Sequence, residues 1–147
     1  MASDDQAATP WPLSAAQEAD LAARAVQARQ WAYAPYSNYH VGAALLTASG
    51  KVYDGVNVEN AAYPSTICAE RTAVVKAVSE GERDFVAIAV SSANGGSPCG
   101  ACRQVLAEFG LDTAVLLVDG AGTITHRTTL RALLPLAFGP EALAAGR

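Results

Sequence analysis

The segment FVAIAVSSANGGSPCGACRQVLAEFGLDTAVLLV, residues 85–118, decides the fold class of this chain. It has the pattern of a strand, a loop, a helix and a second strand in succession. Pro98 stands where a helix favours proline in its first turn, and Gly110 stands where a helix ends. The predicted elements cover residues 85–91, 92–97, 99–109 and 113–118. A helix between two strands favours an α/β domain.

The rest of the chain adds a hairpin and further helices to this unit. Ser14 and Gln17 form a capping-box pattern before a helical stretch, and Ser49-Gly50 joins two β-prone runs as a hairpin turn would. The other predicted helices are residues 15–32 and 68–80, a short one from Thr129 to Leu134 and a last turn over 140–145. The other predicted strands are 41–48, 51–58 and a weaker one near 123–127. These elements predict one layered domain with a mixed sheet over residues 13–147, after a flexible tail over residues 1–12.

Composition and charge narrow the class of protein. The chain has 147 residues, about one domain's worth, and 51% hydrophobic against 16% charged residues argue against disorder. Ten Lys and Arg against fourteen Asp and Glu give a net charge of −4, which disfavours general nucleic-acid binding. The apolar runs are too short for a membrane span, and the N-terminus lacks the basic start of a secretory signal. We therefore expect a soluble cytoplasmic protein that binds neither nucleic acid nor membranes.

The three cysteines fall into two short motifs, Cys68-Ala69-Glu70 and Pro98-Cys99-Gly100-Ala101-Cys102. An odd number of cysteines does not suit a disulfide framework, and free cysteines are most often buried apolar side chains. The combination of C-x-x-C, a preceding proline and a glutamate after the other cysteine favours a metal site instead. Catalytic zinc keeps three protein ligands and leaves its fourth position to water. The cysteines therefore predict an open zinc site.

Charged residues stand next to both cysteine motifs. Glu70 lies two residues beyond Cys68, so it can face the same pocket without binding the metal, as a proton shuttle would. The alternative is an ordinary exposed glutamate near a helix N-terminus. Either Arg71 or, less favoured, Arg103 could donate hydrogen bonds to the sulfur atoms. The alternative for both arginines is an exposed position on a helix.

Four stretches carry a resemblance to a known family. They are Tyr33–Ala44 (YAPYSNYHVGAA), Asn57–Tyr63 (NVENAAY), Cys68–Ala73 (CAERTA) and Pro98–Gln104 (PCGACRQ). From about Leu21 to Phe138 the chain resembles cytidine deaminases of the small homotetrameric type. The resemblance implies a three-layer α-β-α fold with a mixed sheet of about five strands. It also implies one Zn²⁺ per subunit, held by Cys68, Cys99 and Cys102.

The resemblance also implies roles for polar groups around the metal. Glu70 would move protons between water, the N3 atom of cytosine and the leaving ammonia, and the Ala69 amide would bind the base carbonyl. Asn57 and Glu59 resemble the pair that hydrogen-bonds the ribose 3′-hydroxyl. The alternative for this pair is that the two side chains cap a loop.

Three aromatic residues resemble side chains that bind the nucleoside. Tyr39 stands where family members usually have Phe, and its ring can still pack against the nucleoside. Tyr63 resembles a residue that lines the site near a subunit contact. Phe138 resembles an aromatic that reaches a neighbouring subunit's pocket, and Leu136 stands where glycine is common, in the turn that would aim Phe138.

The implied activity is hydrolytic deamination of cytidine and 2′-deoxycytidine to the uridine forms with release of ammonia, in pyrimidine salvage. The implied substrate is a free pyrimidine nucleoside, and the implied assembly is a homotetramer with active sites near subunit interfaces. Two alternatives stay open at this point. One is deamination of a cytosine-containing antibiotic nucleoside on the same scaffold. The other is a structural zinc or RNA-interaction module, in which the metal serves folding alone.

Overall fold

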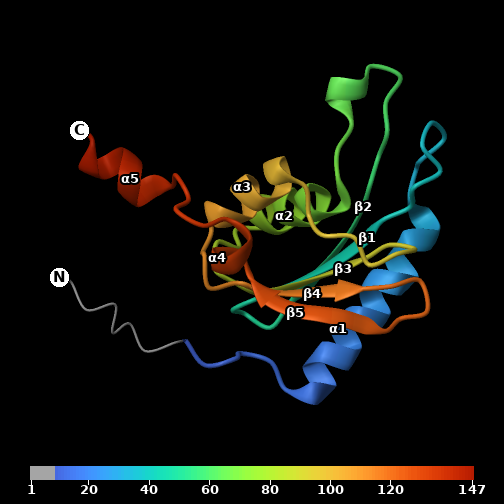
Figure 1. Ribbon diagram of the computed structural model, residues 1–147, viewed down its shortest axis with the longest axis horizontal. Helices are drawn as coiled ribbons and strands as arrows, with labels where there is room; N and C mark the ends of the chain where they lie inside the picture. Colours follow the sequence, from blue (N-terminus) through green and yellow to red (C-terminus); the bar gives the residue numbers. More distant parts are fainter. Residues whose placement is uncertain (1–8) are drawn as a thin grey trace.

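A five-stranded mixed sheet lies between helices on both of its faces (Figure 1). The computed structural model describes residues 9–147. The strands are β1 (Gly42–Thr47), β2 (Val52–Val56), β3 (Phe85–Ser91), β4 (Ala114–Val118) and β5 (Ile124–Thr129). Their order in the sheet is β2-β1-β3-β4-β5, with β3 and β4 parallel and the other neighbouring pairs antiparallel.

The helices begin and end close to the predicted residues. They are α1 (Ala15–Ala28), α2 (Ala69–Ser79), α3 (Gly100–Ala107), α4 (Leu130–Leu133) and α5 (Pro140–Ala145), with 3₁₀ helices at Arg29–Trp31 and Tyr63–Ser65. The Ser14–Gln17 capping box forms, and Thr129 caps α4. The helix predicted to reach residue 32 ends at Ala28, because its last turn tightens into the 3₁₀ form. The strand predicted to end near residue 127 extends to Thr129, because its pairing with β4 continues to that residue.

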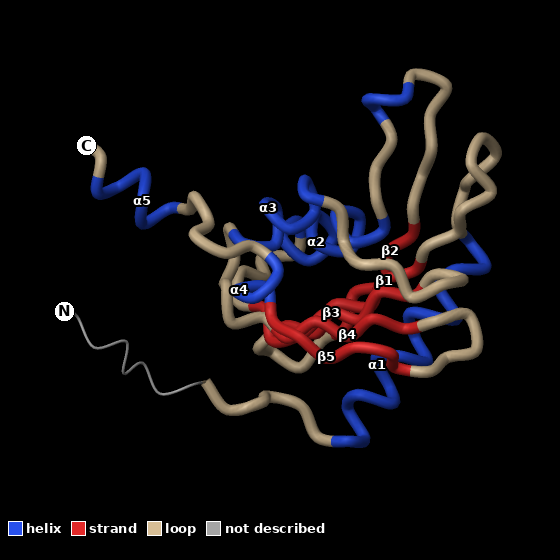
Figure 2. The backbone as a smooth tube through the Cα atoms, in the orientation of Figure 1, coloured by secondary structure: helices blue, strands red, loops and turns tan. Residues whose placement is uncertain are grey.

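The alternation of side chains along the strands divides the core into two layers. On one face of the sheet, Leu45 and Ile88 pack with residues of α2 and α3. On the other face, Ala44 and Ala89 pack with residues of α1. Figure 2 shows the helices on the two sides of the strands. This arrangement confirms the predicted three-layer α/β fold.

Two glycines allow the helices to approach the sheet closely. A Cβ atom on Gly55 of β2 would lie 2.4 Å from the carbonyl oxygen of Ala69 in α2. A Cβ atom on Gly42 of β1 would lie 2.1 Å from the carbonyl oxygen of Ala25 in α1. Both distances are far shorter than a van der Waals contact. The absence of a side chain at Gly55 therefore lets the first turn of α2, which carries the first cysteine motif, lie directly on β2.

Several segments stand away from the sheet and its helices, and two of them carry the predicted site residues Tyr63 and Phe138 (Figure 1). One contains residues 60–66, before α2, and the other contains residues 134–147 and leads outward to α5. We call them the projecting segments. Leu136 in the second one is fully exposed and has φ 52°, in the left-handed region that favours glycine. This conformation suits the glycine that the resemblance leads one to expect at this position.

The N-terminal residues 1–8 lie outside the described residues, so the predicted tail over residues 1–12 is described only from residue 9. Within it, Trp11 Nε1 donates a hydrogen bond to Glu18 Oε2 at 2.9 Å. The division into residues 1–12 and 13–147 stays a prediction. Between residues 9 and 147, no helix has the length and apolar character needed to cross a membrane.

Candidate metal centre and its pocket

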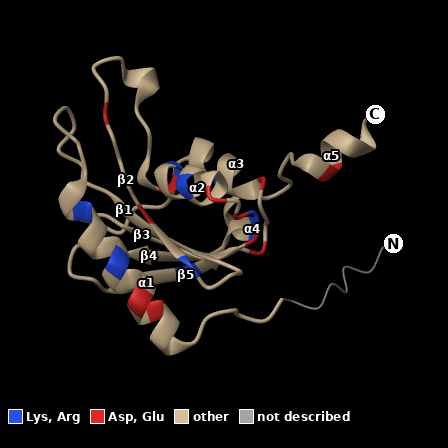
Figure 3. Cartoon of the chain, turned by 180° about the vertical axis from the view of Figure 1, so that it is seen from behind, with Lys and Arg blue, Asp and Glu red and all other residues tan. Residues whose placement is uncertain are grey.

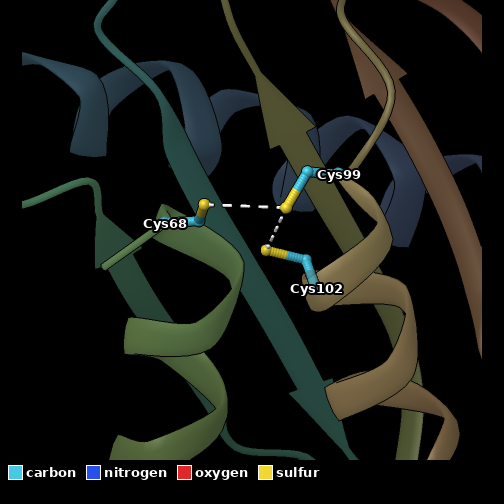
Figure 4. Close-up of side chains that lie close together, drawn as sticks. All are labelled: Cys68, Cys99 and Cys102. Atoms are coloured by element: carbon cyan, nitrogen blue, oxygen red, sulfur yellow. Dashed lines mark hydrogen bonds between the residues drawn. The ribbon is translucent and has the colours of Figure 1, made fainter. Parts of the chain in front are cut away.

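The three cysteine side chains meet where two helices begin (Figure 4). Cys68 is the N-cap residue of α2, Cys99 is the N-cap residue of α3, and Cys102 lies in the first turn of α3. Cys99 Sγ lies 3.9 Å from Cys68 Sγ and 3.5 Å from Cys102 Sγ. All three sulfur atoms lie within 4.8 Å of one another. The fold thus brings both motifs to one point, as the sequence predicted.

The cysteine cluster fits a zinc ion. Tetrahedral zinc with bonds to sulfur of about 2.3 Å holds its sulfur ligands about 3.8 Å apart, close to the separations between these three. Thiolates are soft ligands of the kind that zinc binds. Within residues 9–147, no further His, Cys, Asp or Glu side chain joins this group. The donor set therefore suits one zinc per chain, with three protein ligands and one open position.

Neighbouring donors change the pKa values of the thiols in the cysteine cluster. Arg71 Nη2 donates to Cys68 Sγ at 3.3 Å. The neighbouring Cys102 thiol and the Arg71 guanidinium lower the pKa of the Cys68 thiol. The proximity of Cys68, together with burial, raises the pKa of Cys102. The Arg71 guanidinium therefore offsets the negative charge of a thiolate at Cys68.

Arg103 contacts backbone and hydroxyl groups instead of sulfur. Its Nε donates to the Pro98 carbonyl at 2.8 Å and its Nη2 to Ser97 Oγ at 2.7 Å. Its Nη1 donates to the Leu133 carbonyl at 2.7 Å. The alternative that Arg103 donates to the thiolates is therefore wrong, because its guanidinium is used by oxygen acceptors. It fastens the turn before Cys99 to the end of α4.

Glu70 lies in the first turn of α2 with its side chain buried. It is 4% exposed and lines the same pocket as Cys68 and Cys99. Burial raises the pKa of its carboxyl, because removal from water disfavours the charged form. The alternative of an ordinary exposed glutamate is therefore wrong. A buried carboxyl beside a metal centre is suited to accept and release a proton.

A pocket of about 310 Å³ opens beside the cysteines. The predicted site residues that line it are Tyr39, Asn57, Glu59, Cys68, Ala69, Glu70 and Cys99. Two other predicted residues, Cys102 and Arg71, do not line the pocket. Cys102 is fully buried, and Arg71 follows Glu70 on α2. Residues from the start of α2, from the turn before α3 and from the loop before β1 thus form one concave surface.

Asn57 and Glu59 hold the pocket wall formed by residues 36–41. Asn57 Nδ2 donates to the Tyr39 carbonyl at 2.7 Å, and its Oδ1 accepts from the backbone N–H of Val41 at 2.9 Å. Glu59 Oε1 accepts from the backbone N–H groups of Tyr36 and Ser37, and its Oε2 accepts from Ser37 Oγ at 2.5 Å. The Ser37 bond is the main reason why the pKa of the Glu59 carboxyl is lowered. The two side chains therefore support a loop and also face the pocket.

Tyr63 and Phe138 do not line this pocket. Both lie on the projecting segments, 66% and 62% exposed. The Tyr63 ring lies 6.3 Å from the Tyr36 ring, and the Gln104 side chain donates to the Phe138 carbonyl at 2.8 Å. In the single chain, both rings are exposed, so another molecule could contact them.

Sequence reasoning missed two polar residues that line the pocket, Ser37 and Ser92, and a third, Asn94, that contacts the pocket residue Tyr39. Ser37 donates to Glu59, and Ser92 Oγ and Tyr39 Oη both donate to Asn94 Oδ1. Ser37 lies in the stretch Tyr33–Ala44 that carries the resemblance, but nothing in that stretch shows that its hydroxyl donates to Glu59. Asn94 gave no local signal, because its partner Tyr39 is 55 residues away in the chain.

Comparisons with known proteins identify the family of this chain. Residues 15–118 match the family described as the cytidine and deoxycytidylate deaminase zinc-binding region. The chain is 52% identical over 126 residues to cytidine deaminase of Sporosarcina psychrophila, which covers 84% of this chain and 92% of that protein. The crystal structure of cytidine deaminase from Burkholderia pseudomallei matches with a TM-score of 0.78 and 46% identity, over 86% of this chain and 100% of that one. A more distant relative, blasticidin-S deaminase of Bacillus cereus, is 32% identical over 112 residues, or 69% of this chain and 79% of that protein. The chain therefore belongs to the cytidine and deoxycytidylate deaminase family.

Proposed function

We propose that this protein catalyses the hydrolytic deamination of cytidine and 2′-deoxycytidine to uridine and 2′-deoxyuridine, with release of ammonia. The observation that carries the proposal is the placement of a buried carboxyl, Glu70, in the same pocket as the cysteine cluster. Membership of the family supports the reaction class.

The zinc site and Glu70 divide the chemistry between them. Cys68, Cys99 and Cys102 hold the zinc ion, which when bound acidifies a water molecule and makes it a nucleophile at neutral pH. Glu70 would accept a proton from water and deliver it to N3 of the cytosine ring as the water oxygen bonds to C4. It would then take the remaining proton from that new hydroxyl and pass it to the amino group, so that the C4–N bond breaks and ammonia leaves. Burial suits Glu70 to both steps, because its raised pKa helps the carboxyl to hold the proton between them.

The remaining site residues bind and orient the nucleoside. The backbone N–H of Ala69 is in the first turn of α2, where amides lack partners within the helix, and it donates to the base carbonyl. Asn57 and Glu59 bind the ribose 3′-hydroxyl from the opposite wall, and the Tyr39 ring packs against the nucleoside. The Arg71 guanidinium offsets part of the negative charge that three thiolates would carry.

A free nucleoside suits this chain better than a polynucleotide. The net charge is −4, and the Lys and Arg segments in Figure 3 are scattered over α1, α2, α4 and β5. Counterion release from a nucleic-acid backbone needs a basic surface. A 3′-hydroxyl held by Glu59 also leaves no room for a continuing phosphate. The cytoplasmic location and the place in pyrimidine salvage rest on the sequence and stay predictions.

The active assembly is a homotetramer with its sites near subunit interfaces. Large apolar side chains are exposed on and beside the projecting segments: Tyr33, Tyr36, Val58, Tyr63, Ile67, Leu136, Phe138 and Leu143. An exposed apolar set of this size supports contact with further copies of the chain. Tyr63 and Phe138 would then approach the pocket of a neighbour. Sedimentation velocity tests this proposal, and a stable, fully active monomer would contradict it.

Ultraviolet monitoring of cytidine with the purified protein tests the reaction. We expect conversion to uridine that stops on prolonged treatment with a zinc chelator and returns when zinc is added. A cytosine-containing antibiotic nucleoside serves as the competing substrate, and a higher kcat/KM for it would favour that alternative. Full zinc content with no turnover of either compound would favour the structural zinc module.

A further inference from the structure

The hydroxyl of Tyr39 links the two walls of the pocket. Tyr39 Oη donates a hydrogen bond to Asn94 Oδ1 at 2.7 Å. Asn94 Oδ1 also accepts a hydrogen bond from Ser92 Oγ at 3.2 Å. Ser92 Oγ in turn accepts one from the backbone N–H of Gly96 at 2.8 Å. Tyr39 precedes β1, whereas the other three residues lie between β3 and α3. We call this set of bonds the Tyr39–Asn94 clasp.

Gly96 makes room for the clasp. A Cβ atom on Gly96 would lie 2.6 Å from Tyr39 Oη and 3.5 Å from Asn94 Oδ1. The backbone φ of Gly96 is outside the left-handed region, so a side chain at this position would displace the Tyr39 hydroxyl and would not strain the backbone. The hydroxyl of Tyr39 therefore occupies space that the absence of a side chain at Gly96 leaves free.

The backbone of Tyr39 is held as firmly as its ring. Its N–H donates to Ser37 Oγ at 3.0 Å, and its carbonyl accepts from Asn57 Nδ2 at 2.7 Å. Ser37 in turn donates to Glu59. A continuous series of hydrogen bonds thus runs from the predicted ribose-binding pair, through Tyr39 and Asn94, to the loop that leads into Cys99.

We propose that Asn94 is a positioning residue for the nucleoside, acting through the Tyr39 hydroxyl. The proposal rests on the proposed nucleoside substrate. The ring of Tyr39 lines the pocket, and it has only two side-chain torsions, so one hydrogen bond at its far end fixes its orientation. The bond also joins the loop over residues 92–97 to the wall that carries Asn57 and Glu59. The clasp therefore holds the pocket in its binding form before the substrate arrives.

The effect belongs to binding and not to the chemical step. Asn94 is not among the residues that line the pocket, and the clasp contains no member of the cysteine cluster and no atom of Glu70. Tyr39→Phe removes only the hydroxyl and keeps the ring. Since a typical hydrogen bond changes an equilibrium by about 2- to 12-fold, we expect KM to rise by about that factor. The turnover number kcat and the zinc content should be unchanged.

A double-mutant cycle tests the proposal. Tyr39→Phe, Asn94→Ala and the double variant should raise the KM for cytidine by the same factor, because either change breaks the same bond. Asn94→Asp keeps an oxygen acceptor at this position and should restore most of the affinity lost in Asn94→Ala. Tyr33→Phe is the matched control, since the Tyr33 side chain is exposed and outside the pocket. Additive effects in the double variant, or a KM for Tyr39→Phe equal to that of Tyr33→Phe, would overturn the proposal.

Amide hydrogen exchange separates this proposal from the proposed function. In the substrate-free protein, amide exchange over residues 92–97 should be faster in Tyr39→Phe than in wild type and unchanged in Tyr33→Phe. This readout needs no substrate, so it tests the clasp even if cytidine is not turned over. Equal exchange in all three proteins would overturn the clasp, whereas absent turnover with altered exchange would overturn only the proposed function.

Discussion

The cysteine cluster and the projecting segments differ in what holds their side chains in place. Cys68, Cys99 and Cys102 stand at the starts of two helices that pack on the same face of the sheet, and their sulfur atoms converge within 4.8 Å. Tyr63 and Phe138 stand on backbone that leaves the body of the molecule, and both rings are mostly exposed. One chain thus brings the cysteine cluster and Glu70 together, whereas Tyr63 and Phe138 do not line the pocket of their own chain and would reach a neighbour's pocket in the proposed assembly.

The cysteine cluster therefore bears on the chemical step, and the projecting segments bear on the proposed assembly. Removing a group beside the cysteine cluster should affect turnover in every oligomeric state. Removing a projecting aromatic should affect binding only through the assembly. The following variants test the two halves of this comparison.

Glu70→Gln should have the largest effect. The amide cannot carry a proton between water and the substrate, so kcat should fall by about 10²- to 10⁴-fold. Zinc content should stay at one per chain, because Glu70 is not a member of the cysteine cluster. Steady-state kinetics and metal analysis measure both, with Glu108→Gln, at the exposed residue that follows α3, as the control. A kcat within a few-fold of wild type would remove Glu70 from the reaction.

Gly55→Ala should have the next largest effect. The new Cβ would lie 2.4 Å from the Ala69 carbonyl, so α2 must shift away from β2. Overpacking of this kind lowers the free energy of unfolding by about 1–3 kcal/mol. Urea denaturation should show a lower midpoint with an unchanged slope. Gly139→Ala, where a Cβ meets open space, is the control, and equal midpoints for both variants would show that close approach of α2 is not required.

Phe138→Ala should have the smallest effect of the three. Loss of a buried aromatic contact at a subunit interface corresponds to about 1–2 kcal/mol, so KM should rise by roughly 5- to 30-fold with kcat preserved. Titration of protein concentration should show that the proposed tetramer dissociates more readily. Leu143→Ala, another exposed apolar residue near the same end, distinguishes a specific ring contact from general loss of apolar surface. An unchanged KM in Phe138→Ala would place this ring outside the pocket of any neighbour.

The sequence predicted those features whose signals are local. The C-x-x-C spacing, the proline before it and Glu70 two residues after Cys68 indicated the metal centre, because helix starts fix the geometry of neighbouring residues. The strand over residues 85–91 was predicted to the residue, since its apolar pattern is bounded by a polar turn and a loop.

Features that depend on distant contacts could not be predicted in the same way. The partner of Tyr39 is Asn94, and the partner of Glu59 is Ser37, and both pairs form only when separate loops meet. Arg103 was a possible sulfur donor by its position, but carbonyl groups near α3 and α4 compete successfully for its guanidinium. The early end of α1 was missed for a related reason. Only the tertiary structure shows the 3₁₀ turn that leads the chain toward β1.

X-ray absorption at the zinc edge tests the central claim most directly. In the wild-type protein we expect three sulfur neighbours at about 2.3 Å and one lighter atom. Cys99→Ala should lose zinc, since two thiolates do not hold it against water, and it should lose turnover with it. A zinc ion with four sulfur neighbours, or full zinc content in Cys99→Ala, would contradict an open site built from these three cysteines.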